Sequence, residues 1–155
     1  NMRLHLTVDR QHRINNLPTD ELLQQWANSA YANPDTSITA EAALLIVDRA
    51  TITQYNRDYR QQNKATNVLS FPANLSAIDG IIQLGDIIAC ASVIHAEAEQ
   101  QEKTINAHWA HMMIHSTLHL QNFDHSEKGE AQAMEALEIS LLQQFGFSNP
   151  YLVAD

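Results

Sequence analysis

Alternation of apolar and polar residues near the N-terminus predicts a first strand. Within residues 2–9, Leu4, Leu6 and Val8 alternate with polar side chains, which is the period of a strand with one buried face. Short apolar runs predict three more strands, at residues 43–47, 67–71 and 81–90. The last two are expected in the centre of the sheet, and residues 84–86 are expected to interrupt the last one.

Apolar positions spaced three and four residues apart predict helices between and after these strands. Capping residues and helix breakers indicate where each helix begins and ends. The predicted helices span residues 20–32, 49–61, 93–103, 106–121 and 126–145. In the last one, the acidic residues up to Glu138 are expected to face solvent, while Met134, Leu137 and Leu141 face the core.

Mixed strands and helices followed by helices alone are typical of an α+β fold. We therefore expect a single domain over residues 1–155, with about four strands in a mixed sheet and with helices packed mainly on one face. The chain has 155 residues, of which 45% are hydrophobic, and this is enough for one core. Asn1, which precedes Met2, is interpreted as a remnant of cloning.

The charge of the chain argues against a protein that binds nucleic acid through one broad basic face. The formal net charge is -9, whereas such proteins spread positive charge over a whole surface. Residues 49–64 differ from the rest, because they hold Arg49, Arg57, Arg60 and Lys64 beside a single acid, Asp58. A solvated helix face is the simpler interpretation of this segment, and a phosphate-binding patch is the alternative.

The N-terminal residues predict neither a secretory signal nor a membrane span. They lack an apolar core with a cleavage site, and no run of eighteen apolar residues occurs in the chain. We therefore expect a cytoplasmic location. The lone Cys90 lies in an apolar run and is interpreted as buried and unreactive.

The histidines between positions 108 and 125 predict a metal site at the end of a core helix. His115 and His119 are four residues apart, so their rings share one helix face and can reach one ion at about 2.0–2.1 Å. His111 has the same spacing from His115, but it lies about 12 Å along the axis from His119, too far for one ion. His125, just past the expected helix end, completes the predicted ligand set.

Three neutral imidazoles leave the fourth coordination position of a zinc ion open for water, as catalysis requires. A typical structural zinc site contains several cysteines, and this chain has only one. We therefore predict a hydrolase with one zinc ion per chain; imidazole also suits other first-row metals, and zinc is inferred from its availability. His111 is interpreted as a packed core residue, or as a pocket wall, a support for a ligand or a general base. Asp124 could orient a ligand histidine, or simply favour the next helix N-terminus.

The segment His115-Ser116-Thr117-Leu118-His119-Leu120-Gln121-Asn122-Phe123-Asp124-His125 resembles the H-G-x-L-H-L-x-G-Y-D-H signature of the YbeY family of bacterial rRNA-maturation endoribonucleases. Tyr59-Arg60 and the T-N-V-L-S-F-P run at 66–72 agree in order, and the resemblance extends from about Ile46 to Tyr151. Both signature glycines are replaced, by Ser116 and Asn122. Asparagine tolerates the left-handed conformation, while Ser116 is expected beside the pocket.

The resemblance implies a single-strand-specific, zinc-dependent endoribonuclease that acts in maturation of small-subunit (16S) ribosomal RNA and in ribosome quality control. It implies ribosomal RNA, the small ribosomal subunit and its associated factors as partners, without DNA or membranes. Arg60 matches the arginine of the family's Y-R segment and would bind the scissile phosphate, while His115 holds the ion; both are assigned to catalysis. The nucleophile would be water on the ion or the neighbouring 2′-hydroxyl.

Two other functions compete with this interpretation. The histidine spacing equals that of the metzincin proteases, but Ser116 stands where they carry the glutamate that acts as general base. A ribosome-associated binding factor with a structural metal is the other alternative, because an acidic protein is expected to find RNA through protein partners.

Overall fold

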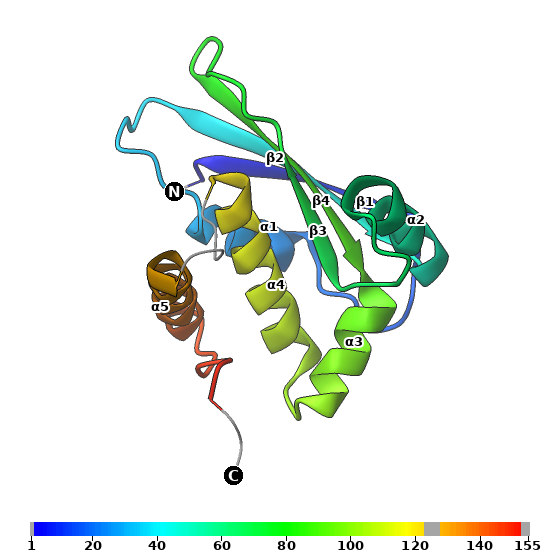
Figure 1. Cartoon of the computed structure of the whole chain (residues 1–155). Coiled ribbons are helices and arrows are strands. Elements are labelled where there is room, and N and C mark those ends of the chain that lie inside the picture. Colours follow the sequence, from blue (N-terminus) through cyan, green and yellow to red (C-terminus); the bar gives the residue numbers. More distant parts are fainter. Residues whose placement is uncertain (1, 123–127, 153–155) are drawn as a thin grey trace.

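The computed structural model describes residues 2–122 and 128–152, and in these ranges it contains one four-stranded sheet and five helices (Figure 1). The elements in chain order are β1 (Leu4–Arg10), α1 (Asp20–Ser29), β2 (Thr39–Val47), α2 (Arg49–Arg60), β3 (Val68–Pro72), β4 (Ile81–Cys90), α3 (Ala91–Gln100), α4 (Ile105–Leu120) and α5 (Lys128–Gln144).

The sheet has the strand order β1-β2-β4-β3. β1, β2 and β4 are parallel, and β3 returns antiparallel beside β4, so the sheet is mixed. The predicted α+β fold is therefore confirmed. The central position expected for residues 67–71 is wrong, because β3 forms an edge of the sheet. A short apolar run has the same sequence pattern in an edge strand as in a central one.

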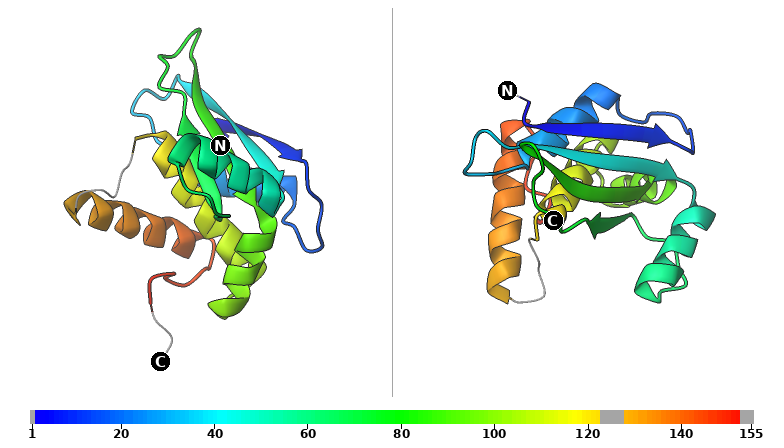
Figure 2. Two further views of the ribbon diagram at one scale, coloured as in Figure 1. Left: turned by 45° about the vertical axis from the view of Figure 1, so that its right-hand side comes forward. Right: turned by 90° about the horizontal axis from the view of Figure 1, so that it is seen from above.

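The two faces of the sheet are covered unequally (Figures 1 and 2). Leu44 and Ile46 of β2 and Ile87 of β4 point into the larger core, to which α1, α3, α4 and α5 contribute. The alternate residues, such as Val47 and Ile88, pack against α2 in a smaller core. Helices thus lie mainly on one face, as the sequence predicted.

Helix α4 lies between the sheet and α5, and it is buried on almost all sides. From His108 to Leu120, every residue is buried except His115 and His119. A helix that is apolar all round belongs in a core, so these two partly exposed imidazoles mark the only place where this stretch of α4 opens to its surroundings.

Gly85 fixes how closely β3 approaches β4. Its φ is +134°, and a Cβ at this position would clash with the carbonyl oxygen of Phe71. β4 continues through the predicted interruption, with a bulge that shifts its register against β2 between Glu41 and Ala42. Only glycine fits here, so the position of β3 depends on it.

No helix in the described part of the chain combines the length and the apolar character needed to cross a membrane.

Replacing Gly85 with Ala should lower the free energy of unfolding by about 2–4 kcal/mol, because the methyl group meets backbone and the φ is strained. Chemical denaturation measures this loss. Gly129→Ala is the matched control: a Cβ there has no atom within 4 Å, and alanine favours the helix. Equal stability of the two variants would contradict the close approach of β3 and β4.

Candidate metal centre and cleft

His115 and His119 lie one turn apart on α4, with ring centroids separated by 4.6 Å. Both line a cleft of about 290 Å³ between α4 and β3. The pairing that the sequence predicted is therefore present on the accessible side of the helix. The cleft is lined by Arg60, Asn67, Val68, Leu69, Ser70, Met112, His115 and His119.

Arg60 reaches this cleft from the end of α2, on the other side of β3. Its Nη2 donates a hydrogen bond of 3.0 Å to the carbonyl oxygen of Ser70, and its Cζ lies 5.0 Å from the centroid of the Phe71 ring. Gln61 ends the helix in the left-handed conformation, with φ 55°. These contacts hold an exposed guanidinium at the edge strand, beside the two imidazoles.

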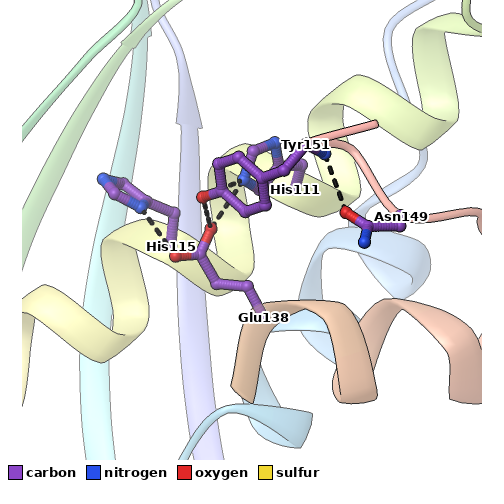
Figure 3. Close-up of polar contacts among 5 residues, drawn as sticks. All are labelled: His111, His115, Glu138, Asn149 and Tyr151. Carbon is purple, nitrogen blue, oxygen red and sulfur yellow. Dashed lines mark hydrogen bonds and ion pairs between the residues drawn. The ribbon is translucent and has the colours of Figure 1, made fainter. Parts of the chain in front are cut away.

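Behind the imidazoles, a buried carboxylate connects three parts of the chain (Figure 3). Glu138 of α5 is 1% exposed. Its Oε1 lies 2.6 Å from Nε2 of His111 and accepts a bond of 2.8 Å from the hydroxyl of Tyr151; its Oε2 lies 3.3 Å from Nδ1 of His115. One carboxylate thus joins α4, α5 and the C-terminal segment.

The protonation of Glu138 follows from these contacts. Burial by itself raises the pKa of a carboxyl group, but hydrogen bonds and charge from His111 and His115 outweigh it and lower the pKa of Glu138 from 4.5 to about 2. Burial and the neighbouring carboxylate raise the pKa of Tyr151. At neutral pH, Glu138 is therefore an anion and Tyr151 is a hydrogen-bond donor to it.

Two sets of residues near α4 could hold an ion. His111, His115 and Glu138 bring three possible ligand atoms within 4.8 Å of one another. His115 and His119 form the second set, on the side of the cleft. The two sets share His115, which presents Nδ1 to Glu138 while its other ring nitrogen points away from that carboxylate (Figure 3).

The remaining residues of the predicted site are placed as follows. His125 and Asp124 lie outside the described residues. His111 is 8% exposed, contacts Glu138 and does not line the cleft, so its place is behind His115. Ser116 is fully buried and likewise does not line the cleft, and its hydroxyl lacks a hydrogen-bond partner within the described part of the chain.

Glu138 is the residue that the sequence pattern misplaced. It was expected on a solvated face of the last helix, and this is wrong, because it lies in the same buried stripe as Met134 and Leu142. The signal was its spacing of four residues from Met134, which puts a carboxylate among core positions. A buried carboxylate requires partners, and only the fold reveals that they are His111, His115 and Tyr151.

Comparison with known proteins gives consistent results. The family model described as "Endoribonuclease YbeY" matches residues 6–146. A curated protein of that name from Cellvibrio japonicus (strain Ueda107) is 44% identical over 135 residues, which cover 87% of this chain and 76% of the relative.

The fold is also similar to that of a solved protein. The solution structure of a protein from Thermotoga maritima aligns with a TM-score of 0.56 at 18% identity, covering 92% of each chain. At this identity the likeness concerns the fold alone. The family match and the 44% identical relative establish more: this chain belongs to the YbeY family of endoribonucleases.

Proposed function

We propose that this protein is a zinc-dependent endoribonuclease that cuts single-stranded RNA in the cleft between α4 and β3. The observation that carries the proposal is that His115 and His119, the only partly exposed positions between His108 and Leu120, line one cleft together with Arg60. Imidazoles suit a divalent transition metal, and a guanidinium suits a phosphate. Family membership supplies the reaction class.

The proposed ligands are His115, His119 and His125. The alternative set with His111 and Glu138 lies in the interior, where Glu138 is 1% and His111 8% exposed, and neither residue lines the cleft. An ion there would not meet a substrate. The donor set beside the cleft fits zinc, because two imidazoles one turn apart are typical ligands of that metal. When bound, zinc supplies a Lewis acid and lowers the pKa of a coordinated water towards about 7.

Glu138 acts on the proposed site through His115. With Nδ1 directed at a carboxylate, the tautomer of His115 is set, and its other ring nitrogen, which points away from that carboxylate, would be the ligand atom for the ion. The same carboxylate accepts from Tyr151 and contacts His111, which keeps it anionic and fixed. His111 is thus assigned to the support of the site rather than to proton transfer in the cleft.

Arg60 is proposed to bind the scissile phosphate. Its guanidinium is held at the mouth of the cleft by Ser70 and the Phe71 ring, and it has further donors for a phosphate oxygen. A fixed positive charge beside the phosphorus stabilises the negative charge that develops during cleavage. This role does not depend on whether water or a 2′-hydroxyl attacks.

The substrate that we propose is small-subunit ribosomal RNA, in its maturation and in ribosome quality control, within the cytoplasm. Because the net charge of -9 repels RNA, we expect the protein to reach its substrate through contacts with the small subunit and its associated factors rather than with RNA alone. A peptidase is disfavoured because Ser116, at the position of the protease glutamate, is buried away from the cleft. A binding factor with a structural metal would leave RNA intact on bound ribosomes.

Changing His119 to Ala should remove the metal and RNA cleavage together, because two imidazoles hold zinc much more weakly than three. Elemental analysis of protein purified without a metal-affinity tag should find about one zinc per chain in the wild type. His5→Ala, at an exposed position in β1, should retain both properties. Equal metal in wild type and His119→Ala, or none in either, would exclude the proposed ligand set.

Arg60→Ala should retain zinc while kcat/KM for a single-stranded RNA falls about 100- to 1,000-fold, because the transition state loses a charged donor. Arg49→Ala tests a second exposed arginine at the opposite end of α2 and should cleave normally. Unchanged cleavage by Arg60→Ala would remove Arg60 from the mechanism. A wild type that binds ribosomes without cutting their RNA would favour the binding factor.

Glu138→Gln should weaken zinc binding about 10- to 100-fold in a chelator competition, because His115 loses its anionic partner. It should also change the acid stability. With a folded pKa of about 2, the ionised carboxylate stabilises the wild type fully above pH 4.5, and this is lost as the pH falls towards 2. The free energy of unfolding of Glu138→Gln should therefore lack the decrease that Glu138 causes in the wild type as the pH falls from 4.5 towards 2.

Glu130→Gln is the control, since Glu130 is an exposed acid on the same helix. Wild-type zinc affinity in Glu138→Gln would show that Glu138 has no part in orienting His115.

A further inference from the structure

The most exposed aromatic side chain among the described residues lies next to Arg60. Tyr59 is 58% exposed, although its neighbours Tyr55 and Phe71 are partly buried. Its ring meets Phe71 edge to face at a centroid distance of 5.3 Å and stacks on Tyr55 at 6.1 Å. Two neighbours therefore hold this ring in place while much of its surface stays open.

The same Phe71 ring connects Tyr59 to the cleft. The Arg60 guanidinium carbon lies 5.0 Å from the centroid of Phe71, and Arg60 lines the cleft together with His115 and His119. Since Tyr59 and Arg60 both contact this ring, at 5.3 and 5.0 Å, they lie within about 10 Å of one another. A nucleotide that flanks a phosphate bound at Arg60 can therefore reach Tyr59.

We propose that Tyr59 is a stacking site for one unpaired nucleobase, next to the phosphate site at Arg60; this inference rests on the proposed function. Unpaired bases stack on exposed aromatic rings, whereas the bases of a duplex already have both faces covered. The charges around Tyr59 favour RNA over an apolar protein partner, because residues 49–64 hold Arg57, Arg60 and Lys64 beside one acid.

The stacking site would give the cleft the selectivity for single strands that the proposed function includes. An aromatic face accepts any base, so it adds affinity without sequence preference. Tyr59 lies on the α2 side of β3, whereas the imidazoles lie on the α4 side. A strand must pass over the edge of the sheet to contact both, and an unpaired strand is flexible enough for this path.

The test compares Tyr59→Leu, which keeps an apolar side chain but removes the ring, with Tyr59→Phe, which keeps the ring. The substrate is a short oligouridylate. Tyr59→Leu should raise KM roughly 5- to 100-fold with little change in kcat, and Tyr59→Phe should match the wild type. Circular dichroism melting checks that both variants fold, as the exposure of Tyr59 leads us to expect.

A second substrate assigns the effect to a base. One abasic nucleotide is introduced into the oligouridylate, in turn at each position that flanks the cut. At the position that stacks on Tyr59, the wild type should bind the abasic substrate as weakly as Tyr59→Leu binds the intact one. Tyr59→Leu itself should lose no further affinity on this substrate. An unchanged KM for Tyr59→Leu overturns the stacking site. A further loss of affinity by Tyr59→Leu on every abasic substrate overturns it as well.

Equilibrium binding of a phosphorothioate oligouridylate, measured by fluorescence anisotropy, separates this inference from the proposed function. If the wild type binds this RNA through Tyr59 but cleaves no RNA, the stacking site stands and the nuclease proposal fails. If the protein cleaves RNA but wild type and Tyr59→Leu bind the oligouridylate with equal affinity, the proposed function stands and the stacking site is wrong. If Tyr59→Leu instead impairs only binding to ribosomal proteins, the surface is a protein contact and the inference is wrong.

Discussion

The buried carboxylate of Glu138 is the constraint on which the site depends. A carboxylate that is 1% exposed can remain ionised only with close hydrogen-bond partners, and here these come from α4 and from the C-terminal segment. Because Glu138 needs these partners, α5 packs against the face of α4 that carries His111 and His115. The orientation of His115 is a consequence of an interior contact rather than of the cleft itself.

The exposed half of the site is built by a different constraint. Gly85 lets β3 approach β4 closely, and β3 then supplies Ser70, whose carbonyl oxygen holds Arg60. The imidazoles belong to a buried helix, whereas the guanidinium belongs to a helix on the other face of the sheet. The cleft thus lies where an edge strand allows side chains from both faces to meet.

Much of this could be predicted from local patterns. Periodicity located four strands and five helices, and the spacing of His115 and His119 placed both rings on one side of α4. What could not be predicted depends on contacts between distant residues. The edge position of β3 and the partners of Glu138 follow from pairing and packing between residues far apart in the sequence, and local spacing carries no information on these contacts.

The order of these residues along the chain has a consequence for synthesis. His115 and His119 are made before Glu138 and Tyr151, and chain elongation on the ribosome proceeds from the N-terminus. A nascent chain that has already exposed α4 still lacks the carboxylate that contacts Nδ1 of His115. The contacts around this carboxylate can therefore form only after the C-terminal segment that carries Tyr151 has been made.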